Sequence, residues 1–121
     1  IHSGYGVLDR LWYPYARTRE PPPELASYEA LARLLDGAHP HHVYRIEQTA
    51  QAYTIRGDLW DYLIDRRRTA GGGVLLSLTL EMGWKPHRHE RTLRRHQLLF
   101  DFLLHAVASH RTWAQPKRPV M

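Results

Sequence analysis

Two residues at the ends of apparent strands could carry out chemistry together. The segment IHSG places His2 at the end of an apparent strand, and the apolar run LSLTLEMG leads into Glu81. Open α/β sheets bind ligands at the carboxyl ends of their strands. A neutral histidine and a carboxylate that meet there could act as a zinc ligand and a general base. The alternatives are a surface or core histidine and a solvated strand terminus.

The composition indicates a folded chain without cysteine chemistry. The 121 residues are 43% hydrophobic and contain no Cys, which excludes disulfides and thiolate metal sites. No segment approaches the roughly 20 apolar residues of a membrane span, so no membrane partner is expected. The chain shows no signal peptide. This leaves the compartment open, with the cytoplasm slightly favoured, and IHSGYG is expected to lie inside a longer chain.

The net charge of +5 is concentrated in two basic stretches, residues 66–68 and residues 85–96. We interpret both as solvated faces, and we assign His87 and His89 to a solvated loop rather than to a metal site. The alternative is an anionic partner. Zinc-finger spacing, RNP-like aromatic strands and a helix-turn-helix pattern are all missing from the sequence, so nucleic acid is not the expected partner.

Apolar spacing and turn residues predict alternating strands and helices. The start of the chain should be the end of a strand. Helices are expected at 25–35, 57–68 and 90–110, strands at 43–46 and 74–82, and an aromatic loop at 11–18. The last helix carries one apolar stripe, made of Leu99, Phe102, Leu103, Ala106 and Val107. The run at 74–82 lacks strict alternation, which is typical of a strand buried on both faces.

These elements predict an α/β fold with a mixed, mostly parallel central sheet flanked by helices. Residues 1–121 would belong to one domain. A strand buried on both faces needs more neighbours than two or three strands provide. We therefore expect this domain to be partial and its sheet to be larger than the chain shows.

Three segments together resemble zinc metallocarboxypeptidases of the carboxypeptidase A-like superfamily, in particular bacterial ones. HSGYGVLDRLWYPYART resembles the segment in which the third zinc ligand precedes a Tyr-Pro-Tyr loop. GDLWDYL resembles the Trp-x-Tyr segment of that family, and LSLTLEMG its strand with the catalytic Glu. Order and approximate spacing agree from His2 to about Gly83. The resemblance covers the C-terminal half of the family's catalytic domain.

The resemblance implies roles for several residues. His2 matches a ligand of Zn²⁺, and Glu81 matches the general base that takes a proton from a zinc-bound water. Tyr53 is the candidate for a mobile tyrosine that closes over the substrate terminus, or else a half-buried loop aromatic. Thr79, on the same sheet face as Glu81 by the period of two, matches a residue of the specificity pocket.

Three further positions match substrate-lining residues. Ser3 and Tyr5 lie near such residues of the family. Asp58, two residues before Trp60, matches the base of the side-chain pocket, where an acid would favour Lys or Arg substrates by charge pairing. Asp58 could equally be the structural Asp beside the Trp in this family, or a helix N-terminal acid without further function.

The resemblance implies a zinc-dependent hydrolase that cleaves a peptide or small amide near a free carboxylate. In the family, two more zinc ligands come from a His-x-x-Glu motif upstream of the third ligand, a region that this chain does not include. Related amidases and deacylases use the same constellation and are an alternative. The alternative from another class is a non-catalytic basic α/β binding module. The substrate and the oligomeric state stay open.

Overall fold

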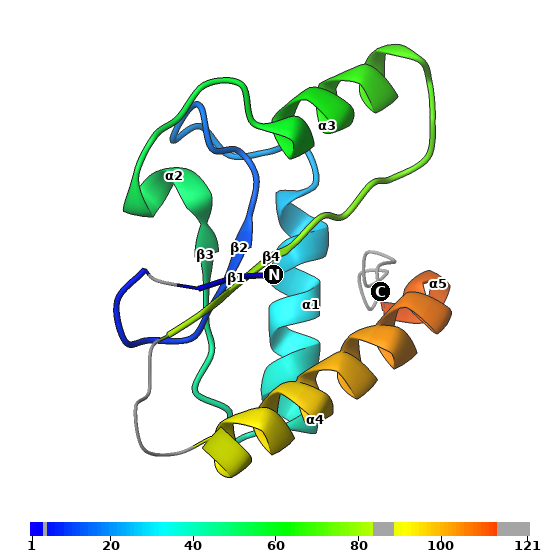
Figure 1. Cartoon of the computed structure of the whole chain (residues 1–121). Coiled ribbons are helices and arrows are strands. Elements are labelled where there is room, and N and C mark those ends of the chain that lie inside the picture. The colour runs from blue at the N-terminus through cyan, green and yellow to red at the C-terminus, as the bar shows by residue number, and fades with distance from the viewer. Residues whose placement is uncertain (4, 84–88, 114–121) are drawn as a thin grey trace. The chain divides into compact units, whose positions relative to one another are not determined.

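The computed structural model describes residues 1–3, 5–83 and 89–113, and the chain separates into two compact units. We call Ile1–Tyr28 together with Val43–Trp84 the sheet unit, and Glu29–His42 together with Lys85–Met121 the helix unit. Figure 1 shows the elements along the chain. The expectation of a single domain over residues 1–121 stays a prediction.

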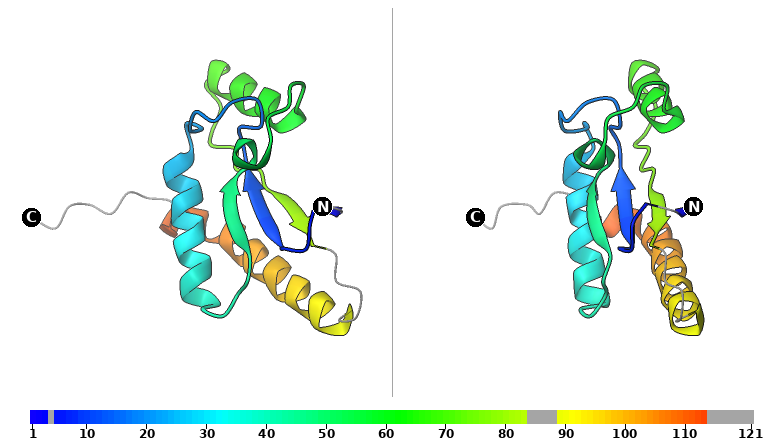
Figure 2. Two further views of the ribbon diagram at one scale, coloured as in Figure 1. Left: turned by 90° about the vertical axis from the view of Figure 1, so that its left-hand side faces the viewer. Right: turned by 60° about the vertical axis from the view of Figure 1, so that its left-hand side comes forward.

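The sheet unit contains a four-stranded mixed sheet. Its strands are β1 (His2–Ser3), β2 (Arg10–Tyr13), β3 (Arg45–Gln48) and β4 (Thr79–Met82), in the order β1-β4-β2-β3. β1 pairs in parallel with β4, β2 pairs in parallel with β3, and β2 and β4 are antiparallel. The direction of β2 beside β3 is visible in Figure 2. The predicted α/β chain with a mixed sheet is confirmed.

Two strand predictions need correction. Residues 11–18 are not all loop, because Arg10–Tyr13 forms β2 between β3 and β4. Pro14 follows the last paired residue, so it ends the strand without removing a ladder hydrogen bond. The strand expected at 74–82 begins only at Thr79. Its buried part does lie between two neighbours, β1 and β2.

The register divides the sheet residues between two faces. Residues that pair across strands share a face, and the faces alternate along each strand. One face, here called the site face, carries His2, Arg10, Trp12, Glu47, Thr79 and Glu81. The opposite face carries Leu11, Leu80 and Met82, all buried. On that second face the ring of Tyr13 stacks on Tyr28, with ring centroids 4.8 Å apart.

The structure has three main helices where the sequence predicts them. They are α1 (Leu25–Ala38), α3 (Leu59–Thr69) and α4 (His89–Ala108). Two short helices, α2 (Thr49–Ala52) and α5 (His110–Trp113), were not expected as separate elements. In the predicted stripe of α4, Leu99, Phe102 and Ala106 are buried, whereas Val107 is 77% exposed and lies outside the core. None of the helices in the described ranges has the length and apolar character to cross a membrane.

Candidate functional site

His2 and Glu81 lie side by side on the site face. They are register partners in the parallel pair of β1 and β4. The Nδ1 atom of His2 is 3.9 Å from Oε2 of Glu81. The other carboxylate oxygen, Oε1, accepts a hydrogen bond of 3.2 Å from the backbone N–H of Tyr5. The two residues that the sequence placed at strand ends are therefore neighbours in the fold.

The Glu81 carboxylate is buried without a strong cation beside it. The residue is 4% exposed, whereas the His2 side chain is 68% exposed. Arg10 stands opposite Glu81 in the register, but its guanidinium pairs with Glu47 at 3.3 Å. In the described part of the chain, Glu81 has no ion pair with a lysine or an arginine. A buried carboxylate is costly unless it is paired, so core packing alone does not explain Glu81.

Three aromatic rings lie beside the carboxylate. Tyr5, Trp12 and Tyr53 contact one another, with ring centroids 5.0 to 5.8 Å apart. Trp12 is buried, and Tyr53 is 39% exposed. The pKa of the Tyr53 hydroxyl is raised, chiefly because burial disfavours the phenolate and also because the charge of Glu81 repels it. Tyr53 therefore stays a neutral hydrogen-bond donor at the edge of the site.

A small pocket of about 70 Å³ brings four predicted site residues together. Its lining includes His2, Trp12, Tyr53, Asp58, Ser77 and Thr79. The hydroxyl Oγ of Ser77 is buried and makes no hydrogen bond. The backbone N–H of the same residue does have a partner, because it donates to the Tyr28 hydroxyl. A buried polar atom without a partner costs about 1–3 kcal/mol. The lining thus includes the Asp58 carboxylate and the hydroxyl groups of Thr49, Tyr53, Ser77 and Thr79, whereas Glu81 is not among the lining residues.

Asp58 has a structural function in addition to its place in the pocket lining. It is the N-cap of α3, and its Oδ1 accepts hydrogen bonds from the backbone N–H groups of Trp60 and Asp61. Of the alternatives that the sequence left open, the helix N-terminal acid is therefore present in the structure. Asp58 and Trp60 also line the small pocket, and the role of Asp58 at the base of a substrate pocket stays a prediction.

The other two predicted substrate-lining residues are Ser3 and Tyr5, and of these Tyr5 is not among the lining residues of the small pocket. Tyr5 reaches Glu81 through its backbone, and Ser3 pairs with Met82 rather than with Glu81. The sequence did not single out Trp12 or Ser77 as lining residues. Ser77 could have been found, because it lies two residues before Thr79 in an extended segment. The sequence does not indicate Trp12, because its segment is interpreted as a loop and not as a strand.

The donor set for zinc is incomplete in the described residues. A catalytic zinc ion takes about three protein ligands, and the described residues contain no group of three His, Cys, Asp or Glu side chains that could hold a metal. Of the described residues that line the small pocket, His2 is the one with an imidazole. A His-x-x-Glu spacing does occur from His87 to Glu90. It follows Glu81 instead of preceding His2, and His87 lies outside the described residues.

Comparison with protein families, with characterised proteins and with solved structures finds no significant match for this chain. The fold and the residues of the site face are therefore the basis of the functional argument.

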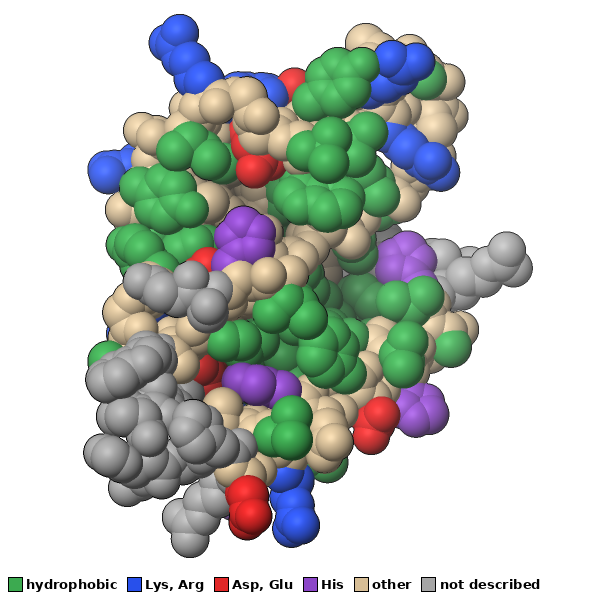
Figure 3. Space-filling view, viewed as in Figure 1, with side chains coloured by type: hydrophobic (Ala, Val, Ile, Leu, Met, Phe, Trp, Pro, Cys, Tyr) green, Lys and Arg blue, Asp and Glu red, His purple; other side chains and the backbone are tan. Residues whose placement is uncertain are grey.

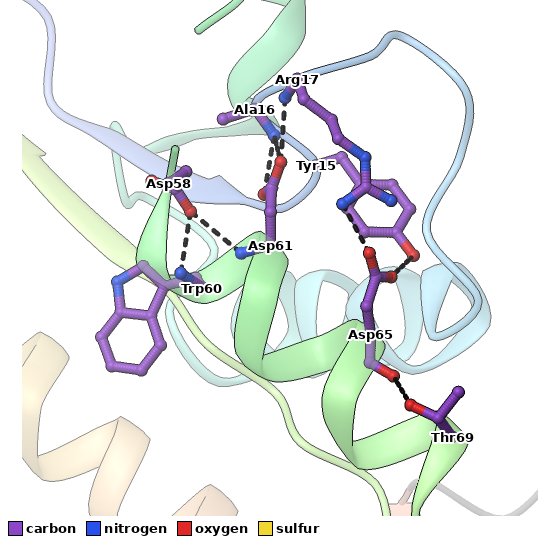
Figure 4. Close-up of polar contacts among 8 residues, drawn as sticks. All are labelled: Tyr15, Ala16, Arg17, Asp58, Trp60, Asp61, Asp65 and Thr69. Carbon is purple, nitrogen blue, oxygen red and sulfur yellow. Dashed lines mark hydrogen bonds and ion pairs between the residues drawn. The ribbon is translucent and has the colours of Figure 1, made fainter. Parts of the chain in front are cut away.

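α3 is held against the loop at 15–17 by a buried carboxylate. Asp61 accepts hydrogen bonds of 2.9 Å from the backbone N–H groups of both Ala16 and Arg17 (Figure 4). Asp61 is itself buried. This contact fixes the N-terminal turn of α3, and with it Asp58 and Trp60.

Replacing Asp61 by asparagine is expected to lower the free energy of unfolding by about 2 kcal/mol, because the amide nitrogen faces a backbone N–H that needs an acceptor. Urea denaturation at neutral pH measures the change. Asp101→Asn, at an exposed acid of α4, is the control and should change the stability by less than about 0.5 kcal/mol. An equal effect of both substitutions would contradict the role of Asp61 as the acceptor that holds α3 against the loop at 15–17.

A second carboxylate of α3 joins the same loop at its surface. Asp65 pairs with Nη1 of Arg17 at 2.6 Å and accepts a hydrogen bond of 2.8 Å from the Tyr15 hydroxyl. The pKa of Asp65 is lowered from its usual 3.8, chiefly because Arg17 donates a hydrogen bond to the ionised form, while burial opposes the shift. Both side chains of the pair are about 40% exposed, so its contribution is at most about 1 kcal/mol.

This shift predicts a pH-dependent stability. A carboxyl group whose pKa is lower in the folded state stabilises the fold above its unfolded pKa, and the stabilisation is lost as the pH falls through the folded pKa. Asp65→Asn should therefore lower the stability by about 0.5–1 kcal/mol at neutral pH. The difference from the wild type should shrink as the pH drops below 3.8. Urea titrations at several pH values test this, and a difference that stays constant into acid would refute it.

Proposed function

We propose that this chain is the C-terminal half of the catalytic domain of a zinc metallocarboxypeptidase-like hydrolase. The observation that carries the proposal is the buried Glu81 carboxylate, whose Oε2 faces the exposed imidazole of His2 at 3.9 Å. The resemblance of the three segments supports the same assignment. The zinc carboxypeptidase-like fold, larger than the sheet unit, is part of this proposal.

In this proposal Glu81 is the group that moves the proton. Its Oε1 is held by the Tyr5 N–H, which leaves Oε2, on the side of His2, to accept a proton from a water molecule. The same atom then returns the proton to the amine that leaves. Zinc, when bound, would polarise the water and the substrate carbonyl. His2 would be one of its ligands, and the others would come from outside the described residues.

The substrate would be a peptide or small amide with a free carboxylate. Tyr53 would donate a hydrogen bond over the bound terminus, and Thr79 and Asp58 would line the pocket for the last side chain. The pocket of about 70 Å³ corresponds to about two water volumes. It suits the charged head of a basic side chain, which the Asp58 carboxylate would attract.

The experiment that tests the function is hydrolysis of a small substrate panel by the native protein. The panel contains blocked dipeptides with C-terminal Lys or Leu, their C-terminal amides, an N-acyl amino acid and a glutamyl amide. A carboxypeptidase cleaves the free-acid dipeptides, stops when a chelator is added and recovers with zinc. Cleavage of only the N-acyl amino acid or the glutamyl amide would instead assign a deacylase or an amidase.

One observation favours the non-catalytic alternative. The N–H group of Tyr5 donates a hydrogen bond to the Glu81 carboxylate, and such a structural contact requires no catalytic role. No hydrolysis of any panel member, together with no zinc in the native protein, would support a binding module.

A further inference from the structure

A second concave surface of the sheet unit lies along α3. We call it the α3 groove. It is lined by residues 17–18, by residues 56–58 and by the face of α3 from Asp61 to Thr69, with a volume of about 800 Å³. This volume lies in the range of about 300–1,000 Å³ that is typical of ligand sites. The groove meets the small pocket only at Asp58, which lines both.

Each acidic side chain of the α3 groove accepts hydrogen bonds or forms an ion pair within the protein. Asp58 accepts two backbone N–H groups at the start of α3. Asp61 accepts the N–H groups of Ala16 and Arg17, and Asp65 is paired with the Arg17 guanidinium, as Figure 4 shows. Asp61 and Asp65 therefore have little remaining capacity for a cation, whereas Asp58 uses a single carboxylate oxygen, Oδ1, for both of its hydrogen bonds.

Two arginines of the α3 groove have most of their guanidinium N–H groups free of hydrogen bonds to the described part of the protein. Arg56 and Arg66 are both exposed and line the groove. Arg56 makes no hydrogen bond or ion pair with the rest of the described chain, and Arg66 donates only one bond, to the Tyr62 hydroxyl at 2.8 Å. A guanidinium has five N–H donors in a fork that fits a carboxylate or a phosphate. Among the arginines that line the groove, Arg56 and Arg66 are thus the two without an ion pair to the described residues, whereas Arg17 is paired with Asp65.

Apolar surface lies next to these arginines. Leu59 and Tyr62 of α3 are more than half exposed. Figure 3 shows hydrophobic side chains over α3 with arginine side chains at their border. The exposed ring of Tyr62 beside these arginines fits a peptide partner that carries both apolar and anionic side chains.

We infer that the α3 groove binds an acidic peptide segment, with carboxylates on Arg56 and Arg66 and packing against Tyr62. Nucleic acid fits less well, because its continuous phosphates need more cations than the two arginines of the groove that lack an ion pair within the described chain. A peptide can place its carboxylates at the two arginines alone. The inference does not rest on the proposed hydrolase, since Glu81 is not part of the groove.

The test is fluorescence anisotropy with a labelled oligoglutamate peptide. The wild type should bind it with saturation, and Arg56→Ala/Arg66→Ala should weaken the Kd about tenfold or more, because both charge-assisted contacts to the peptide carboxylates are lost. Arg33→Ala/Arg45→Ala is the matched control. It removes the same charge from exposed arginines that do not line the groove, and it should change the Kd less than about twofold.

Two more measurements sharpen the result. The Arg56→Lys/Arg66→Lys protein should recover only part of the affinity, because lysine keeps the charge but not the fork. Glu81→Gln should bind as the wild type does, which separates this inference from the catalytic one. Equal weakening by the control pair, or no saturable binding by the wild type, would overturn the inference. Tighter binding of oligothymidylate with the same dependence on Arg56 and Arg66 would overturn it in favour of nucleic acid.

Discussion

Glu81→Gln is expected to lower kcat/KM of the native protein about 100- to 10,000-fold, the usual range for loss of a general acid–base group. Glutamine has the same shape and keeps an oxygen that can accept the Tyr5 N–H. It cannot accept a proton from water at Oε2. The substitution therefore removes the chemistry while the fold stays intact, and steady-state kinetics on the panel substrates measure the loss.

The matched control is Glu47→Gln on the same sheet face. Glu47 pairs with Arg10 and accepts a hydrogen bond from the Trp12 indole, but it does not touch His2 or line the pocket. Glu47→Gln should therefore change kcat/KM less than about fivefold. Circular dichroism spectra of both variants should match the wild type. Comparable losses in both variants would mean that charge on this face, and not Glu81, supports activity.

Gly83→Ala is expected to destabilise the sheet unit by about 4 kcal/mol or more, or to prevent folding. A Cβ atom at this position would lie 2.2 Å from the backbone oxygen of Val7 and 2.8 Å from the backbone carbon of Leu8. Backbone atoms cannot rotate away as a flexible side chain can. The Gly83 N–H also donates to the buried Asp9 carboxylate at 2.9 Å, so any shift would break this bond.

Gly37→Ala is the control for this substitution. Gly37 lies in α1, and an added Cβ would meet nothing within 4 Å. Alanine is favoured over glycine inside a helix by about 1 kcal/mol, so Gly37→Ala should leave the stability unchanged or raise it. Urea or thermal unfolding compares the two variants. A Gly83→Ala protein as stable as the wild type would show that the chain after β4 does not pass Val7 as described.

The pairing of His2 with Glu81 agrees with the sequence, which places both residues at the ends of apparent strands. In the structure His2 opens β1 and Glu81 is the third residue of β4. The start of α3 could be predicted too, since Asp58 before a short apolar run is a typical N-cap. Both features depend on local patterns. The structure has them at the expected positions.

Other parts of the site depend on contacts between distant segments. The segment at 10–13 forms a strand because it pairs with both β3 and β4, although the adjacent Pro14 favours a loop. The N–H of Tyr5 that holds Glu81 is a backbone donor, which no side-chain pattern reveals. The hydroxyl of Ser77 lacks a partner only because of how the surrounding chain packs.

The measurement that tests the central claim most directly is the zinc content of the native protein and of its His2→Ala variant. Inductively coupled plasma mass spectrometry after gel filtration gives the stoichiometry without an assumption about the substrate. We expect about one zinc per chain in the wild type, a value close to this in Glu81→Gln, and little or none in His2→Ala. A wild-type protein without zinc, or a His2→Ala protein that keeps its zinc, would contradict the central claim.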